Sequence, residues 1–131
     1  MAANTNGGQI ASVLIVEDSP PQALKLKLAL ESNDCQVYWA ETGQGGLDMA
    51  QEEHFDLIVL DIGLPDINGF EVCKKLKADP GLADIPVVML TTRDHAHDVL
   101  NGLEVGAVDY IPKDAFAETV LLETIKQMRS A

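Results

Sequence analysis

Five short apolar runs rich in Val and Ile constrain the fold of this chain most strongly. They are "SVLIV" (12–16), "CQVYW" (35–39), "DLIVL" (56–60), "IPVVML" (85–90) and "VDYI" (108–111). Three of them are nearly continuous rather than alternating, which is typical of strands buried on both faces of a parallel sheet. The segments between them are long enough for the helices that parallel crossovers require. The sequence therefore predicts an α/β fold, with five parallel strands and helices on both faces of the sheet.

The first expected helix is the least obvious one. "ALKLKLAL" (23–30) alternates apolar and polar residues, and this pattern alone would predict a strand. The preceding "SPP" (19–21) is a helix-start signal, and Ala, Leu and Lys are all strong helix formers. We therefore expect a helix here, with Leu24 and Leu28 on its outer face.

Four other segments have helical character, and their apolar residues set the expected bounds. The last of them carries Val120, Leu121, Ile125 and Met128, which we expect to be buried. The four helices are expected at 43–53, 68–79, 94–106 and about 115–128.

Length and charge limit the class of function. The 131 residues suit one domain, expected at 12–131 after a disordered lead at 1–11. The net charge of -12 argues against nonspecific binding to nucleic acid or to an anionic membrane. No apolar run approaches the roughly 18 residues of a membrane span, and the first residues do not form a signal peptide. Cys35 and Cys73 match no metal or redox spacing, so we expect both to be buried in a reducing cytoplasm.

Charged and hydroxyl side chains collect where the predicted strands end. Glu17 and Asp18 follow the first strand, and Asp61 follows the third. Thr91 follows the fourth strand and Lys113 the fifth. Ligands of open parallel sheets bind outside the carboxyl ends of the strands, so we expect these side chains to converge on one edge.

Three carboxylates at one edge would repel one another, so the pKa of at least one of them would rise. A bound Mg²⁺ relieves the repulsion, because this hard cation takes one or two carboxylates, keeps several waters and recruits phosphate oxygens. We expect Asp18 and Asp61 to ligate it directly, and Glu17 to do so through a water molecule. The backbone carbonyl of Gly63, two residues past Asp61, is a further expected ligand.

The remaining groups suit phosphoryl chemistry on Asp61. A carboxylate can act as a nucleophile and form an acyl phosphate. Transfer then needs charge neutralisation around three equatorial oxygens. Mg²⁺ takes one oxygen, the Thr91 hydroxyl can donate to a second, and Lys113 can pair with the third.

Five motifs surround these residues: "VED" (16–18), "LDIGLPDINGFE" (60–71), "MLTT" (89–92), "GAVDY" (106–110) and "PKD" (112–114). Together they resemble the receiver domains of two-component response regulators over residues 12–129, in particular stand-alone, chemotaxis-regulator-like receivers. The resemblance implies a flavodoxin-like (βα)5 doubly wound sheet of order 2-1-3-4-5. It also implies that Asp61 is the phosphoacceptor and that the protein turns over no separate substrate.

Further roles follow from the same resemblance. Thr91 would move to the phosphoryl group and Tyr110 would change rotamer, so both would report phosphorylation. The output surface would be helix four, strand five and helix five, which would dock a protein target of unknown identity. The phosphodonor would be a histidine kinase or a histidine phosphotransfer protein. Its helical bundle would dock on the first helix, for which Leu24 and Leu28 are candidates.

The loop after the fifth strand departs from the family pattern. Receivers usually have a proline directly after the conserved lysine, with a cis peptide bond, but here Pro112 precedes Lys113 and Asp114 follows it. A cis bond without proline would cost ~3 kcal/mol or more. We therefore expect a trans bond after Lys113, with Asp114 capping the last helix.

Arg93 and Gly63 occupy positions that vary among receivers and tune the access of hydrolytic water. Arg93 lies two residues beyond Thr91. We expect the lifetime of the phosphoryl group to depend on this arginine, which the dephosphorylation rate of an Arg93→Ala variant would measure.

Two other functions are open at this point. A Mg²⁺-dependent phosphohydrolase of the haloacid-dehalogenase kind also uses an aspartyl nucleophile, but it carries a second acid where this chain has Gly63. A flavodoxin-like flavin carrier would need a glycine- or hydroxyl-rich phosphate loop where this chain has "EDSPP" (17–21).

Two further features have structural explanations. In "DHAHD" (94–98), the two histidines are two residues apart and so would not share a helix face as metal ligands would. Trp39 suits packing at the sheet edge.

Overall fold

The computed structural model describes residues 11–91, 107, 109–113 and 117–130, and the helix expected at 94–106 lies outside these ranges. The strands form one sheet of order β2-β1-β3-β4-β5 in which every neighbouring pair is parallel. This confirms the predicted α/β fold and strand order. The elements are β1 (Ala11–Val16), α1 (Pro20–Glu31), β2 (Cys35–Ala40), α2 (Gly43–Glu52), β3 (Leu57–Asp61), α3 (Gly69–Ala78), β4 (Val87–Thr91), β5 (Asp109–Pro112) and α5 (Ala117–Ser130).

Most of the observed strand ends differ from the predicted ones by one or two residues, and the difference matters for the site. Asp61 and Thr91 are the last residues of β3 and β4 rather than the first residues of the following loops. Lys113 follows β5 directly. Backbone ladders therefore fix these positions, as in the bond from the Ile62 N–H to the Leu90 carbonyl at 3.1 Å.

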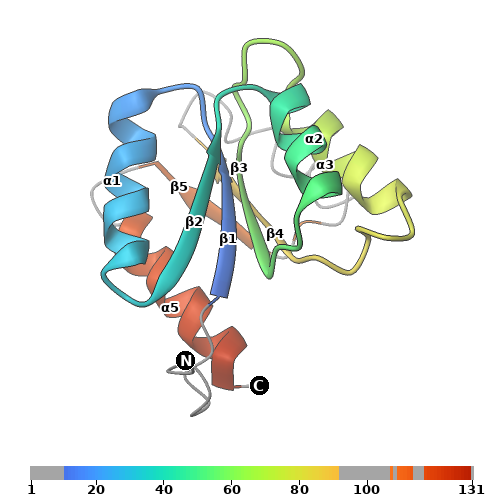
Figure 1. The fold of residues 1–131 in the computed structure, drawn as a ribbon. Coiled ribbons are helices and arrows are strands. Elements are labelled where there is room, and N and C mark those ends of the chain that lie inside the picture. Colours follow the sequence, from blue (N-terminus) through green and yellow to red (C-terminus); the bar gives the residue numbers. More distant parts are fainter. Residues whose placement is uncertain (1–10, 92–106, 108, 114–116, 131) are drawn as a thin grey trace.

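Two separate hydrophobic cores explain why the strand sequences are continuously apolar. In β1, Leu14 and Val16 enter the core beneath α2 and α3, whereas Val13 and Ile15 enter the core beneath α1 and α5. Figure 1 shows these two pairs of helices on opposite faces of the sheet. Each fully buried aliphatic side chain contributes about 1.5–3 kcal/mol. Both faces must therefore be apolar, and the alternation of a half-exposed strand is lost.

Helix α1 confirms that the alternating segment is helical. Ser19 is the N-cap and Pro20 opens the first turn, although the Ser19 side chain makes no capping hydrogen bond. Leu26 is buried, while Leu24 and Leu28 are 53% and 54% exposed. Residues two apart lie on nearly opposite sides of a helix, so the alternating leucines form one buried and one exposed stripe.

For one residue of the last helix, the prediction of burial is wrong. Val120 is 40% exposed, although Leu121 and Ile125 are buried as predicted. The buried stripe of α5 runs through Ala117, Leu121 and Ile125 at four-residue intervals, and Val120 falls outside it. The helix also extends beyond its expected end, to Ser130.

The loop between Asp61 and α3 is constrained at Asp66 and at Gly69, where the helix begins. A Cβ atom on Gly69 would clash with the Asp61 carbonyl oxygen and would lie 2.8 Å from the Ile62 Cα, so α3 can begin here only with glycine. Asp66 accepts hydrogen bonds from the N–H groups of Gln44 (3.0 Å) and Gly43 (2.8 Å) in the first turn of α2. These two bonds hold the pKa of Asp66 below its usual value. The loop that carries the predicted ligand carbonyl is thus anchored to α2.

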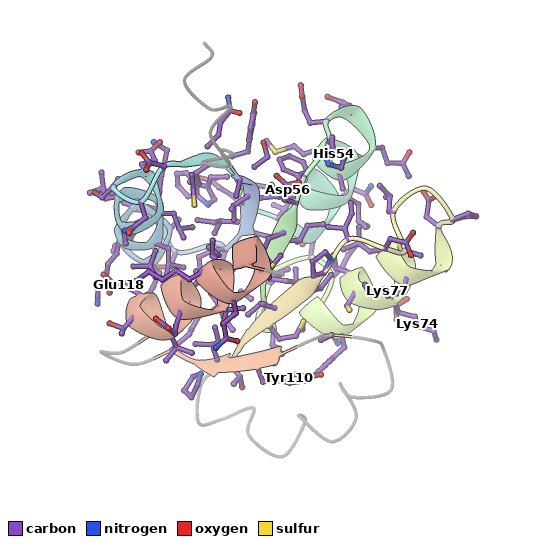
Figure 2. The ribbon with its side chains drawn as sticks, turned by 90° about the horizontal axis from the view of Figure 1, so that it is seen from below. His54, Asp56, Lys74, Lys77, Tyr110 and Glu118 are labelled. Atoms are coloured by element: carbon purple, nitrogen blue, oxygen red, sulfur yellow. The ribbon has the colours of Figure 1, made fainter. Side chains whose placement is uncertain are left out.

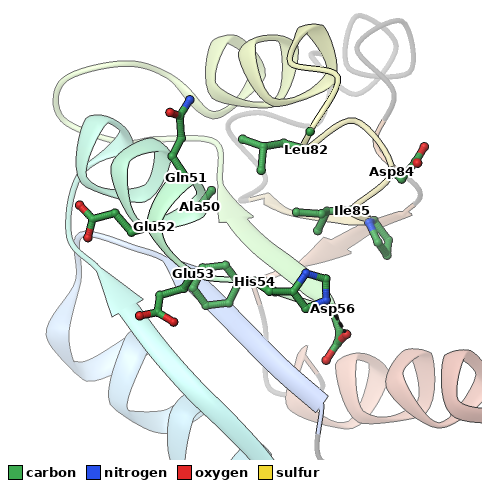
Figure 3. A pocket seen from close by; sticks show the side chains of 12 residues that line it. Ala50, Gln51, Glu52, Glu53, His54, Asp56, Leu82, Asp84 and Ile85 are labelled. Atoms are coloured by element: carbon green, nitrogen blue, oxygen red, sulfur yellow. Dashed lines mark ion pairs between the residues drawn. The ribbon is translucent and has the colours of Figure 1, made fainter.

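A hollow of about 550 Å³ lies at the amino ends of β3 and β4, between the end of α2 and the loop before β4 (Figure 3). His54 and Asp56 lie together at its rim, with 3.4 Å between Nε2 and Oδ1. Asp56 also exchanges two bonds with the Ser12 backbone at 2.8 Å each, which ties the start of β3 to β1. Its lining contains none of the described residues predicted for the functional site. Within the described ranges, no helix is long and apolar enough to cross a membrane.

Candidate functional site

Three acidic side chains meet at the carboxyl edge of the sheet. One carboxylate oxygen from each of Glu17, Asp18 and Asp61 lies within 4.8 Å of the others. Glu17 and Asp18 lie in the loop between β1 and α1, and Asp61 ends the neighbouring strand β3. The prediction that these groups converge is confirmed, because adjacent parallel strands end at the same edge.

Within this group, Asp61 is only 3% exposed. Its Oδ1 accepts a hydrogen bond from the Gly63 N–H at 3.2 Å. Its Oδ2 lies 3.1 Å from the Nζ of Lys113. Each oxygen of Asp61 therefore has one donor group beside it, a backbone N–H or the lysine ammonium.

Lys113 bridges Asp61 and Glu17. Its Nζ lies 2.7 Å from Oε1 of Glu17, and the lysine side chain is 12% exposed. Burial lowers the pKa of Lys113, but the hydrogen bond to Glu17 and the charges of Asp61 and Glu17 outweigh this effect and raise it overall. The side chain therefore remains an ammonium group.

Glu17 is fully buried, and all four of its polar groups have protein partners. Burial raises the pKa of its carboxyl group, while the hydrogen bond from Lys113 opposes that rise. Its Oε2 accepts from the Ser19 N–H at 3.1 Å. Its own N–H donates to the Ala40 carbonyl at 3.0 Å, and its carbonyl accepts from the Trp39 Nε1 at 2.8 Å. Water-mediated metal ligation by Glu17 remains a prediction.

The bond from Trp39 is the contact that the sequence analysis missed. The sequence offered one signal, a tryptophan at the end of the strand adjoining the Glu17 loop. The predicted packing is correct, because Trp39 is partly buried against the core beneath α1 and α5. Its indole nitrogen, however, also reaches the acidic loop.

Thr91 and Gly63 lie beside the acidic group. Thr91 is buried at the end of β4, and its carbonyl accepts from the Lys113 N–H at 2.8 Å. Gly63 is exposed, two residues beyond Asp61, in the anchored loop. Arg93 and Asp114 lie outside the described residues, as does the geometry of the bond after Lys113, so those expectations stay predictions.

Tyr110 lies on β5, the strand at the opposite edge of the sheet from β2. It is half-buried against the core beneath α3, and Figure 2 shows it on the same side of the sheet as Lys74 and Lys77 of that helix. Burial raises the pKa of its hydroxyl group, and the nearby Cys73 adds to this effect. The aromatic ring thus occupies an edge position between the core and solvent, where it was expected as a switch.

The acidic group fits a magnesium ion by its chemistry and its access. All three side chains offer hard oxygen ligands, which Mg²⁺ prefers over nitrogen or sulfur. Asp61 and Glu17 are buried, but Asp18 is exposed, so one side of the group is open to solvent. Mg²⁺ keeps several waters and binds phosphate oxygens, and an open side leaves room for both.

A flavodoxin-like sheet with a buried aspartate, further acids and a lysine at its carboxyl edge defines a receiver domain. Comparison with protein families matches residues 13–126 to the response regulator receiver domain. The chain therefore belongs to this family. It is a phospho-accepting response regulator of two-component signalling, and not an enzyme with a separate substrate.

Individual relatives agree with this assignment. PilH from Pseudomonas aeruginosa is 40% identical over 116 residues, which are 88% of this chain and 95% of PilH. The response regulator ArlR from Staphylococcus aureus is 38% identical over 112 residues, which are 86% of this chain but only 50% of ArlR. The crystal structure of the signal receiver domain of a signal transduction histidine kinase from Syntrophus aciditrophicus is 37% identical, with a TM-score of 0.83, and covers 92% of this chain and 90% of that one.

The family assignment decides between the three functions considered from the sequence. The haloacid-dehalogenase-like hydrolase and the flavin carrier are set aside. A receiver takes its phosphoryl group from a histidine kinase pathway, so a histidine kinase is implied as a partner.

Proposed function

We propose that Asp61 is the phosphoacceptor of this receiver. The observation that carries this assignment is the environment of its carboxylate, which is nearly buried, paired with Lys113 and surrounded by Glu17 and Asp18. The Gly63 N–H and the Lys113 ammonium each contact one oxygen of this carboxylate, and a carboxylate can act as the nucleophile that forms an acyl phosphate.

In the transfer step, one Asp61 oxygen attacks the phosphorus atom of the donor's phosphoryl group. A bond forms between that oxygen and phosphorus, and the bond between phosphorus and the donor breaks. The donor leaves with the bonding electron pair, which for phosphohistidine returns to the imidazole nitrogen. The product is an acyl phosphate on Asp61, and hydrolysis later restores the carboxylate.

Lys113 and Thr91 stabilise the transferring group in this proposal. Lys113 already lies 3.1 Å from Asp61 and can follow the negative charge onto a phosphoryl oxygen. Thr91 ends the adjacent strand and offers a hydroxyl donor at the same edge. Asp18, Asp61 and the Gly63 carbonyl would hold Mg²⁺, with Glu17 acting through water. The bound ion supplies positive charge that neutralises the phosphoryl oxygens.

The experiment that tests this function uses the full chain with a small acyl phosphate and Mg²⁺. We expect one phosphoryl adduct by intact mass, labile in the way an acyl phosphate is, on the peptide that contains Asp61. The same mixture with EDTA should give no adduct. An adduct mapped to a different peptide, or one formed equally well in EDTA, would contradict the assignment.

An Asp18→Asn variant should separate metal binding from folding. We expect its Mg²⁺ dissociation constant, measured by calorimetry, to rise about tenfold or more because a charged ligand is lost. In EDTA its free energy of unfolding should rise, because one of three crowded negative charges is removed. Asp84→Asn, at an exposed carboxylate near the opposite end of the sheet, is the matched control and should alter neither quantity. A decrease in both metal affinity and metal-free stability would count against the crowded-carboxylate account.

We also propose that the phosphodonor protein docks on α1. Leu24 and Leu28 form an exposed apolar pair on a helix that begins two residues after Asp18, so a protein lying on this helix reaches the acidic edge. A Leu24→Ser, Leu28→Ser double variant should accept phosphate more slowly from a histidine kinase that phosphorylates the wild type. Its rate with the small acyl phosphate should be unchanged. If the kinase transferred phosphate to the double variant and to the wild type at equal rates, α1 would not be the docking site.

The output of the receiver is proposed to pass through Thr91 and Tyr110 to a surface that includes β5 and α5. The helix predicted at 94–106, expected to complete this surface, lies outside the described residues. The half-buried position of Tyr110 on an edge strand supports a ring that can change rotamer. Beryllofluoride with Mg²⁺ mimics the phosphoryl group and should shift the ring signals of Tyr110 in NMR spectra more than those of Tyr38. Equal shifts of both rings would argue against this switch.

A further inference from the structure

Trp39 joins the edge strand of the sheet to the acidic loop. It lies on β2, which pairs only with β1 in the described sheet, and it is in register with Ile15. Its ring packs on the core beneath α1 and α5. From there the indole Nε1 donates a hydrogen bond of 2.8 Å to the carbonyl of Glu17.

The carbonyl that Trp39 binds belongs to the peptide group between Glu17 and Asp18. A peptide group is planar, so fixing the direction of its carbonyl constrains ψ of Glu17 and φ of Asp18 together. The preceding peptide group is also fixed, because the Glu17 N–H donates to the Ala40 carbonyl at 3.0 Å. The end of β2 therefore holds the backbone on both sides of Glu17.

We propose that Trp39 is a positioning residue for the metal and phosphoryl site. Its indole N–H sets the plane of the Glu17–Asp18 peptide group and thereby directs the two carboxylates. Glu17 is directed to Lys113 and Asp18 to the open side of the acidic group. The inference rests on the proposed role of Asp18 as a metal ligand.

Packing alone does not require the donor that Trp39 supplies. The neighbouring Tyr38 packs by its ring, with an edge-on contact to Phe55 at 5.3 Å between centroids. A phenyl ring at position 39 would also fill much of the space, but it could not donate to the Glu17 carbonyl. The bond therefore gives tryptophan a function beyond hydrophobic burial.

Loss of the bond should weaken metal binding more than it affects the chemistry. Without the donor, the Glu17–Asp18 peptide group can rotate, and the exposed Asp18 samples directions that do not face Asp61. Binding the ion must then select the productive arrangement from a larger set, which raises the dissociation constant. One net hydrogen bond corresponds to a rise of about 3- to 10-fold.

The test compares full-length Trp39→Phe with the wild type. We expect the Mg²⁺ dissociation constant from calorimetry to rise about 3- to 10-fold. The Mg²⁺ concentration for half-maximal phosphorylation by the small acyl phosphate should rise in parallel, while the rate at saturating Mg²⁺ stays near that of the wild type. Tyr38→Phe, an aromatic change at the adjacent β2 position, is the matched control and should leave both values unchanged.

A second variant isolates the N–H group. Replacing Trp39 by benzothienylalanine keeps the shape of the indole and removes only the donor, so it remains informative if Trp39→Phe fails to fold. A wild-type Mg²⁺ dissociation constant in this variant would overturn the inference. The failure of the proposed function looks different, because the wild type itself would then bind no Mg²⁺ or form no adduct on Asp61.

Discussion

Asp61→Asn is expected to abolish formation of the phosphoryl adduct while preserving the fold. Asparagine has nearly the same shape as aspartate, and its amide can still lie in the space between Lys113 and the Gly63 N–H. An amide is not a nucleophile toward phosphorus under these conditions, so no acyl phosphate can form at position 61. The adduct measured by intact mass should fall to the level seen in EDTA.

The matched control for this variant is Asp48→Asn, which alters an exposed aspartate of α2 that is hydrogen-bonded to Gln44. It should form the adduct at the wild-type rate. Circular dichroism should show the same helix and strand content in both variants. A phosphoryl adduct that persists in Asp61→Asn would mean that another residue is the acceptor, and the site would have to be reassigned.

Lys113→Ala is expected to lower the free energy of unfolding by about 3–5 kcal/mol in buffer without metal. The substitution leaves Glu17 buried without its counter-ion, and removing one partner of a buried pair typically has this cost. Asp61 also loses its contact with the Lys113 ammonium, so the repulsion between Glu17 and Asp61 is no longer offset by a positive charge between them. Urea unfolding in EDTA measures the change, and Lys74→Ala on α3 should differ from the wild type by only about 0.5 kcal/mol.

The deficit of Lys113→Ala should increase with pH. Burial already holds the pKa of Glu17 above its reference value of 4.5, and removal of Lys113 raises it further. Between the unfolded and folded pKa values, unfolding releases a proton, so the free energy of unfolding falls as pH rises through that interval. We therefore expect a larger deficit at pH 8 than at pH 5.

A second substitution tests the cause of that deficit. Adding Glu17→Gln to Lys113→Ala removes the unpaired buried charge, so it should recover part of the lost stability and flatten the pH dependence. The same change in the wild-type background should destabilise the protein, because Lys113 then loses a partner. If Glu17→Gln had the same effect in both backgrounds, the two residues would not be coupled.

Much of the fold follows from local pattern. The continuous Val- and Ile-rich runs predict strands covered on both faces, and the structure has a core on each face of the sheet. The rule that ligands bind at the carboxyl ends of parallel strands was enough to predict that Asp18, Asp61 and Lys113 lie at one edge. Periodicity alone predicted a strand for α1, because leucines on two opposite sides of the helix alternate along the sequence. The helix-forming residue composition gave the correct prediction.

What the sequence could not provide depends on tertiary geometry. Val120 is exposed because the buried stripe of α5 is set by the direction in which the helix crosses the sheet. The pairing of Lys113 with Glu17 depends on how far two long side chains reach across the edge. The bond from Trp39 depends on the register of β2 against β1, which places the indole beside the carbonyl that follows the strand.

The hydrogen bond of Trp39 also makes the site observable. Trp39 is the sole tryptophan of the 131 residues. Intrinsic fluorescence excited at wavelengths longer than those that tyrosine absorbs therefore comes from one indole. Indole emission responds to the hydrogen bonding of its nitrogen and to nearby charge, and here that nitrogen is bonded to the loop that carries Glu17 and Asp18. Occupancy of the acidic edge can therefore be titrated optically in the unlabelled protein.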